Sequence, residues 1–418
     1  MNEQPRQPRP EDVRTPGLGA HDVNAEAHGA PAPPALAPAA ADVSATGARS
    51  SWLSPLNQRR WRNFRRNSRA FWSLILFSVL FGLSLFAEFI ANDRPLLVTY
   101  QGEWHFPVFQ FYPETAFGGD FRTEADYRAP EVRCLIVSGG LEACFDDPEG
   151  VIEDAADGVV AGADIERGSI TWPIVPFSYD TIVDKPGVAP GPPDEVNWLG
   201  TDDTKRDVLA RVIHGFRLSV LFTLIVTAIA SAIGIALGAI QGYFGGWVDL
   251  GMQRFIEIWT AMPSLYVIII LFAILGRSFW LLVFVTTLFA WPALVGVVRA
   301  EFLRARNFEY IRAAKALGVR NSTIMFRHML PNAMVATLTL LPFIITGGIG
   351  TLASLDFLGF GLPSSAPSLG ELTRQAKDNL QAPWLGFTAF FTFAIMLSLL
   401  VFIFEGVRDA FDPRKTFQ

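Results

Sequence analysis

The chain has 418 residues, of which half are hydrophobic and 18% are charged, and its formal net charge is −6. The charged share is below the roughly 25% that is usual in soluble domains. The sequence has no G-x-x-x-x-G-K-[ST] phosphate loop, no H-E-x-x-H zinc motif and no G-x-S-x-G nucleophile motif. It therefore offers no site for ATP hydrolysis, a catalytic metal or a bound cofactor within this chain.

Long uncharged stretches dominate the chain, and each has about the 20 residues that a helix needs to cross a bilayer. Lipid cannot satisfy backbone polar groups, so such stretches form helices. Six of them are hard to bury in one soluble domain, and we expect an all-α polytopic membrane protein. The predicted spans are about 70–91, 218–240, 256–275, 278–299, 331–353 and 384–404.

Basic residues gather on one side of these spans. They precede the first span, separate the fourth from the fifth and follow the sixth. The 91–200 segment instead has 20 acidic and 6 basic side chains. Because Lys and Arg favour cytoplasmic loops, both termini are expected in the cytoplasm and the 91–200 segment outside. The basic residues are Arg59, Arg60, Arg62, Arg65, Arg66, Arg69, then Arg299, Arg304, Arg306, Arg312, Lys315, Arg320, Arg327, and finally Arg408, Arg414, Lys415.

Two segments precede the first span. Residues 1–50 are rich in Ala and Pro and lack an apolar period, which predicts a disordered cytoplasmic tail. Residues 51–69 mix Trp, Leu and Phe with six arginines. This composition is typical of a segment that lies along the inner membrane surface, where anionic lipids attract it. A nucleic-acid role is disfavoured, because these arginines adjoin a span.

The 92–200 segment is aromatic and turn-rich and predicts a small ordered module of short strands and turns. It contains the chain's two cysteines, Cys134 and Cys144. An oxidising compartment permits a disulfide between them, with two free thiols as the alternative.

The second part of the chain, residues 201–418, opens on "TDDTKRDVLARVIHGFR". Apolar residues recur there at helical spacing, which predicts an amphipathic helix on the outer membrane face that leads into the second span. Thr201 or Asp202 is expected to cap it. For the Asp202–Asp203 pair we favour a cap and salt-bridge role over a metal site.

Small residues cluster within the spans, as in "AIASAIGIALGAIQGYFGG" and "TGGIG", and favour close helix packing. No Asp, Glu, Lys or Arg lies deep in a predicted span, which argues against an ion-coupled carrier or channel. The spans also contain no plausible catalytic pair, which argues against an intramembrane enzyme.

The loop over 304–330 has the pattern of two short helices. Asn307 is expected to cap the first, Gly318 to end it in the left-handed conformation, and Asn321 or Ser322 to start the second. Pro331 is expected to bend the chain into the fifth span. Tyr310, Ala313, Ala314 and Leu317 are predicted to share one face. This pattern fits either a knob that docks on another protein or a plain interfacial loop.

Four separated motifs resemble the dipeptide/oligopeptide/nickel permeases of binding-protein-dependent ABC importers. "RAAKALG", nine residues and "HMLP" resemble the family's coupling motif, with Arg312 in place of Glu and His328 in place of Ile. "LGTDDTKRDVLARVIHGFRLSV" has Lys205 where Gly is usual, and "LDFLGFGLPSSAPSLGEL" has Leu369 where Trp is frequent. "GVRDAFDPRK" resembles the family's closing motif. The long acidic insertion is most similar to one subunit type of a Gram-negative peptide importer.

The resemblance implies the MetI-like permease fold and a heterodimeric importer in the Gram-negative inner membrane. It implies peptide transport from periplasm to cytoplasm by alternating access, with a dipeptide or nickel importer as the alternative. The implied partners are a second homologous permease, ATPase subunits that bind ATP and Mg, and a periplasmic peptide-binding protein. Membrane lipid is expected around the spans.

The resemblance also implies two functional segments. The second, third and fifth spans are expected to line the pathway, and an external re-entrant loop over Asp356–Leu369 is expected to contribute to its gate. The ATPase-coupling residues are expected to be Glu309, Tyr310, Arg312, Ala313, Ala314, Lys315, Leu317, Gly318 and Pro331, and the gate residues Asp356, Gly359, Gly361 and Pro363.

Overall fold

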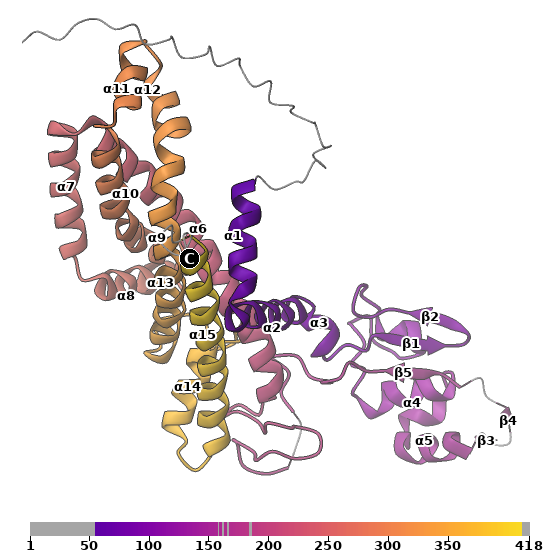
Figure 1. Ribbon diagram of the computed structural model, residues 1–418. Coiled ribbons are helices and arrows are strands. Elements are labelled where there is room, and N and C mark those ends of the chain that lie inside the picture. The colour runs from indigo at the N-terminus through magenta and orange to yellow at the C-terminus, as the bar shows by residue number, and fades with distance from the viewer. Residues whose placement is uncertain (1–54, 158, 161–162, 165–166, 184–185, 412–418) are drawn as a thin grey trace, which may run out of the picture. The chain divides into compact units, whose positions relative to one another are not determined.

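The computed structural model describes residues 55–157, 159–160, 163–164, 167–183 and 186–411 (Figure 1). The predicted tail over 1–50, residues 51–54 of the predicted 51–69 segment and the last motif from residue 412 onward lie outside the described residues. Most of the described chain is helical, with short strands confined to the 92–200 segment.

Among the described residues, five helical segments are long and apolar enough to cross a membrane. A bent pair of helices makes a sixth span if it is counted as one. This confirms a multi-pass helical protein. The segments are Ser68–Leu85 (α2), Val208–Phe244 (α6), Phe279–Ala305, Asn321–Phe357 and Pro383–Phe411 (α15), and the bent pair is Gly246–Ala261 (α7) with Ser264–Leu275 (α8).

The bent pair corrects the third predicted span. α7 and α8 meet at 70°, so a single straight helix over 256–275 is wrong. Met262 has an extended backbone at the break, and Pro263 follows it. Proline disfavours the helical conformation in the residue before it and cannot donate a backbone hydrogen bond, so the helix ends there.

The second span differs from the prediction at its start. α6 is one continuous helix of 37 residues and includes the expected amphipathic segment. Its N-cap is Asp207, whose carboxylate accepts from the amide of Ala210 at 2.7 Å. Neither Thr201 nor Asp202 caps the helix, because the chain turns once more between residues 201 and 207, where Thr201 and Asp207 form a bridge.

The fourth span consists of α9 (Phe279–Ala290) and α10 (Pro292–Ala305), joined at Trp291. α10 packs along α6 over much of its length. Three glycines of α6, namely Gly234, Gly238 and Gly242, permit this close approach. The predicted role of the small residues in helix packing is confirmed at this contact.

The fifth span begins earlier than predicted. After α11 (Glu309–Ala316), the chain continues through α12 (Asn321–Thr323), a π-helical turn η3 (Ile324–Met329) and α13 (Leu330–Phe357). The sequence predicts that Pro331 bends the chain into this span. Pro331 lies in the first turn of α13, and the wide π turn before it accommodates the missing donor without a break.

The 92–200 segment forms a mixed module after α3 (Ala87–Ile90). Its sheet has the antiparallel order β2-β1-β5, made by Glu103–His105, Leu97–Tyr100 and Ser169–Thr171. A small core with Val98, Phe117 and Ile136 lies beneath it. The other elements are η1 (Glu114–Phe117), α4 (Pro130–Ser138), η2 (Glu142–Phe145), α5 (Pro148–Asp157), β3 (Val159–Val160) and β4 (Ala163–Asp164).

The disulfide of this module joins α4 to η2. Cys134 and Cys144 are fully buried and bonded, with their Cα atoms 5.5 Å apart. Leu135 and Val151 pack around them.

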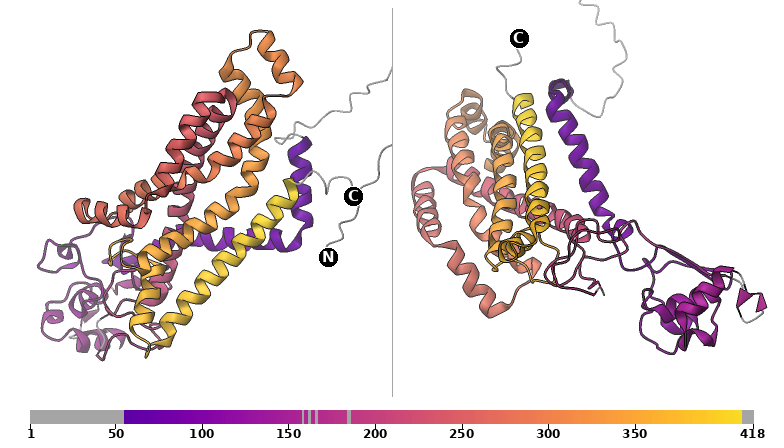
Figure 2. Two further views of the ribbon diagram at one scale, coloured as in Figure 1. Left: turned by 90° about the vertical axis from the view of Figure 1, so that its left-hand side faces the viewer. Right: turned by 90° about the horizontal axis from the view of Figure 1, so that it is seen from below.

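Two further helices complete the fold. α1 (Pro55–Arg66) contains most of the arginines that precede the first span, and Asn67 separates it from α2 and caps α2. α14 (Leu369–Asp378) follows the loop after α13. α13 therefore runs from the short helices α11 and α12 at one end to residues 358–369 at the other (Figure 2).

Candidate functional site

Helix α11 is attached to the rest of the fold by its inner face. Ile311 is fully buried against Phe302, Ile324 and Met329. On the same helix the Oη of Tyr310 accepts from Nδ2 of Asn332 at 3.0 Å, which joins α11 to the first turn of α13. The ammonium of Lys315 lies 4.5 Å from the ring centroid of Tyr243 on α6. Sequence reasoning missed Ile311, although an apolar residue in a polar helix was a usable signal.

The cap expected at Asn307 is wrong. Phe308 holds the N-cap position and makes no side-chain cap bond. Nδ2 of Asn307 instead donates to the carbonyl of Leu303, in the last turn of α10. The chain turns too soon after α10 for Asn307 to reach forward into α11.

The outer face of α11 is free for contact with another molecule. Leu317 is 84% exposed, and Tyr310 and Ala313 are also exposed. Ala314 is half-buried and packs against the cluster that contains Ile311. Glu309, Arg312 and Lys315 are exposed as well.

Gly318 ends α11 with φ of +74°, as the sequence indicated. The amide of Val319 donates to the carbonyl of Ala314, and that of Gly318 to Lys315. A Cβ at Gly318 would touch nothing within 4 Å. Glycine is therefore favoured here by the left-handed backbone and not by lack of space.

The loop after α13 is built around Asp356. The Asp356 carboxylate accepts from the amide of Leu362 at 2.7 Å and from Oγ of Ser368 at 2.5 Å. Gly359 turns the chain with φ of +78°. At Gly361 a Cβ would lie 1.7 Å from Oδ1 of Asp356, so only glycine fits. Three of the four expected gate residues thus form one turn, and Pro363 follows it.

Two arginines that sequence reasoning missed hold this loop from the side. Arg206 pairs with Asp202 at 2.8 Å and donates to the carbonyl of Ser364 at 2.9 Å. Arg211, which is 1% exposed, lies 3.5 Å from the same carboxylate and donates to the carbonyl of Ala366 at 3.1 Å. The sequence signal for these ion pairs was the two arginines that closely follow the two aspartates.

Arg211 also reaches the 92–200 module. Its Nη1 donates to the carbonyl of Tyr179 at 3.3 Å. One buried guanidinium therefore joins three separate segments: the end of the module, the start of α6 and the loop after α13. We call Asp202, Arg206 and Arg211 the arginine cluster. The predicted salt-bridge role of Asp202 is confirmed.

The neighbouring cap is also buried. Burial raises the pKa of Asp207, although Nδ2 of Asn197 donates to the carboxylate at 2.9 Å and the amide of Ala210 donates at 2.7 Å. Among the described residues, no three His, Cys, Asp or Glu side chains gather into a possible metal site.

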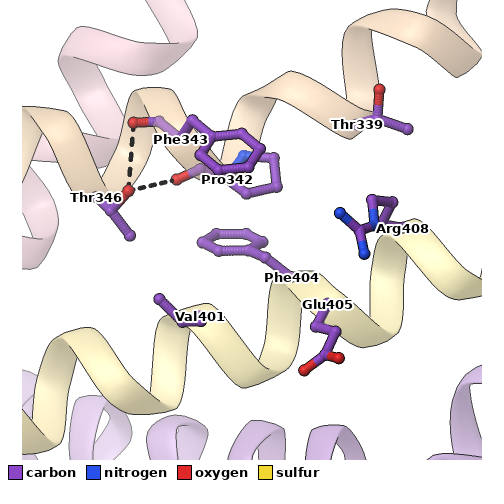
Figure 3. A pocket seen from close by; sticks show the side chains of 8 residues that line it. All are labelled: Thr339, Pro342, Phe343, Thr346, Val401, Phe404, Glu405 and Arg408. Atoms are coloured by element: carbon purple, nitrogen blue, oxygen red, sulfur yellow. Dashed lines mark hydrogen bonds between the residues drawn. The ribbon is translucent and has the colours of Figure 1, made fainter.

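A cavity of about 230 Å³ lies between α13 and α15 (Figure 3). It is mostly apolar, with one charged edge formed by Glu405 and Arg408. Pro342 interrupts the backbone bonding of α13 here, and Oγ1 of Thr346 donates to its carbonyl at 3.0 Å. The remaining lining residues are Thr339, Phe343, Val401 and Phe404.

The sequence matches two described families. Residues 234–417 match the family described as "Binding-protein-dependent transport system inner membrane component". Residues 54–105 match the "N-terminal TM domain of oligopeptide transport permease C".

Curated relatives extend this match to most of the chain. One is the "Peptidoglycan transport system permease protein YejE" of Agrobacterium fabrum, 52% identical over 392 residues, which cover 88% of this chain and 95% of the relative. Another is the "Inner membrane ABC transporter permease protein YejE" of Escherichia coli K12, 53% identical over 368 residues, which cover 87% and 99%. The chain belongs to the ABC transporter permease family. The resemblance found in the sequence is confirmed, and α11, the loop after α13 and the α13–α15 cavity lie within the first of the two family matches.

One similar solved structure is that of the inward-facing MetNI methionine ABC transporter. That chain is 16% identical with a TM-score of 0.42, and the likeness covers 48% of this permease and 96% of that chain.

Proposed function

We propose that this permease is a membrane-spanning subunit of an ATP-driven importer for peptides or peptide-like compounds. The observation that carries the proposal is the identity above 50% to two YejE permeases over nearly their whole length. One of these is named for peptidoglycan transport, and a more distant relative, OppC of Bacillus subtilis, is named for oligopeptide transport and is 34% identical over 53% of this chain.

The proposal assigns sides to the fold. The arginine-rich α1 and the 304–330 loop lie in the cytoplasm of a Gram-negative cell, and the acidic 92–200 module lies in the periplasm. Both termini are then cytoplasmic. The module and the loop after α13 face a periplasmic peptide-binding protein that delivers the substrate.

Helix α11 is the coupling helix in this proposal. Its exposed face docks into a cleft of an ATPase subunit, which binds ATP and Mg, while this chain binds no cofactor. Ile311 and the Tyr310–Asn332 contact transmit movement of α11 to α13. A second, homologous permease completes the pathway, and the two subunits expose it alternately to each side.

Partner identification tests the proposal. The chain is tagged at its C-terminus, extracted from native membranes in mild detergent, and its partners are identified by mass spectrometry. We expect an ATPase and a second permease. The ATPase alone should be lost from a Glu309→Arg/Gly318→Val variant, and a Gly318→Asn variant should retain it, because Asn tolerates the left-handed conformation. Recovery of the chain alone, able to pass solute without ATP, would contradict the importer and favour a channel.

Transport measurements test the coupling role separately. A β-branched residue at φ of +74° costs roughly 1–2 kcal/mol, which should displace the end of α11. We expect Gly318→Val to insert normally in the membrane while ATP hydrolysis no longer drives peptide uptake. Normal uptake by this variant would refute the coupling role of α11.

A further inference from the structure

A second slot, of about 410 Å³, lies on the other side of α15 from the α13–α15 cavity. α1 forms one wall with Arg60, Trp61 and Phe64, and α15 forms the other with Ile403 and Val407. Leu74 of α2 closes the apolar end. Direct packing of α1 on α15, where Phe64 meets Ala410, holds the walls together.

The slot has a polar end and an apolar end. The polar end is formed by Asn57 and Arg60 of α1. The apolar end is formed by Leu74 and Ile403, which lie in helices long enough to cross a membrane. The guanidinium of Arg60 lies 4.4 Å from the ring centroid of Phe411 and donates to Oδ1 of Asn57 at 3.4 Å. A cationic group therefore stands beside an apolar slot at the edge of the membrane.

The charge around the slot is strongly positive. Six arginines lie between residues 59 and 69, and no Asp or Glu occurs between residues 54 and 87. The acidic groups at this end of α15 are Glu405 and Asp409, and neither lines the slot. Glu405 instead lines the cavity on the opposite side of α15.

We propose that this slot binds one anionic glycerophospholipid of the inner leaflet. The phosphodiester pairs with Arg60, and an acyl chain lies along Trp61, Phe64, Val407 and Ile403. Water fits poorly against these apolar walls, and a zwitterionic lipid would gain less from the arginines. The bound lipid would join α1 to α15, so the position of the first helix would depend on the lipid composition of the membrane.

Native mass spectrometry of the full-length permease in detergent tests this site. The probes are phosphatidylglycerol and phosphatidylcholine of equal chain length. We expect one tightly retained phosphatidylglycerol. Arg60→Gln should weaken its retention by about fivefold, the effect of one basic residue near an anionic headgroup. Val407→Trp should also release it, because the indole fills the slot.

Arg62→Gln is the matched control. Arg62 is exposed on the same helix, does not line the slot, and its loss should leave retention unchanged. Equal losses from Arg60→Gln and Arg62→Gln would mean diffuse attraction to α1 and overturn the site. Retention of phosphatidylglycerol by Val407→Trp would also overturn the site. Lipid binding that appears only after residues 2–50 are removed would overturn it as well, because the N-terminal residues of the chain would then fill the slot.

Discussion

The glycines of α6 show how single residues decide the packing of this permease. They recur every four residues, and a Cβ at each would lie within 3 Å of a backbone carbonyl oxygen of α10 or of Trp291, which directly precedes α10. The distances are 2.6 Å for Gly234 to Trp291, 2.8 Å for Gly238 to Val295 and 2.6 Å for Gly242 to Arg299. Because the obstacle is backbone, it cannot move aside as a side chain would.

We therefore expect Gly238→Ala to destabilise the permease. The added Cβ would also lie 2.9 Å from Cβ of Val298, and overpacking of this kind costs typically 1–3 kcal/mol. The melting temperature of the detergent-solubilised protein should fall. Gly251→Ala is the control, since a Cβ at Gly251 in α7 meets nothing within 4 Å, and an equal shift in both variants would contradict the packing argument.

The sequence alone predicted that these glycines permit close contact, because small residues at helical spacing are typical of membrane helix interfaces. It could not predict α10 as the partner, since composition does not say which helices meet. The same limit applies to Arg211. Its role depends on Tyr179 and Ala366, which are distant from it in the sequence.

At the scale of elements, hydrophobicity predicted most spans but not their interruptions. The break at Met262–Pro263 lies within an uncharged stretch, and hydropathy does not distinguish a straight helix from a bent one. Pro331 lies in the first turn of α13, directly after the π turn, where a proline is tolerated in a helix. The cap at Asp207 was missed because Thr201 and Asp202 also have cap-forming side chains. The turn between these residues and Asp207 determines that Asp207 caps α6.

The arginine cluster joins the loop after α13 to the start of α6 and to the 92–200 module. We expect Arg211→Lys to loosen the loop after α13, because lysine cannot reach both the Tyr179 and Ala366 carbonyls with a planar group. Amide hydrogen exchange over residues 360–368 should become faster, and uptake should fall.

Arg217→Lys is the control for that experiment. Arg217 lies two turns along α6 and pairs with Glu88 on the half-exposed surface. Its replacement should leave exchange of the 360–368 amides unchanged. Equal protection of the loop in the wild type and in Arg211→Lys would show that the loop holds its shape without the arginine cluster.

At the scale of the whole molecule, the sequence indicated a mixed module between the first two spans but could not give its fold. The strands described in the module are only two to four residues long, and the module depends on a sheet that pairs Leu97–Tyr100 with Ser169–Thr171 across about 70 residues. Such distant pairing leaves no local signal. The segment over 106–121, expected as strands and turns, contains the 3₁₀ turn η1.

The ends of this module lie close together, so it can be removed cleanly. Ala91 and Val175 form a bridge, and the amide of Asn92 donates to the carbonyl of Val175 at 3.2 Å. Replacing residues 94–172 by a short Gly-Ser linker keeps this bridge, the contact of the His214 ring with the carbonyl of Ala91 at 2.9 Å, and Tyr179 beside Arg211. The spans should therefore fold and insert as before.

If the module widens the docking surface for the binding protein, replacing residues 94–172 should weaken the affinity of the permease for the binding protein by about tenfold. A tenfold loss corresponds to ~1.4 kcal/mol of binding free energy. Uptake driven by the binding protein should fall with it, while the amount of co-purifying ATPase should stay the same. A Cys134→Ser/Cys144→Ser variant is the matched control, because it removes the disulfide and keeps the module surface. Unchanged binding-protein affinity and uptake in the deletion variant would exclude a docking role of the module.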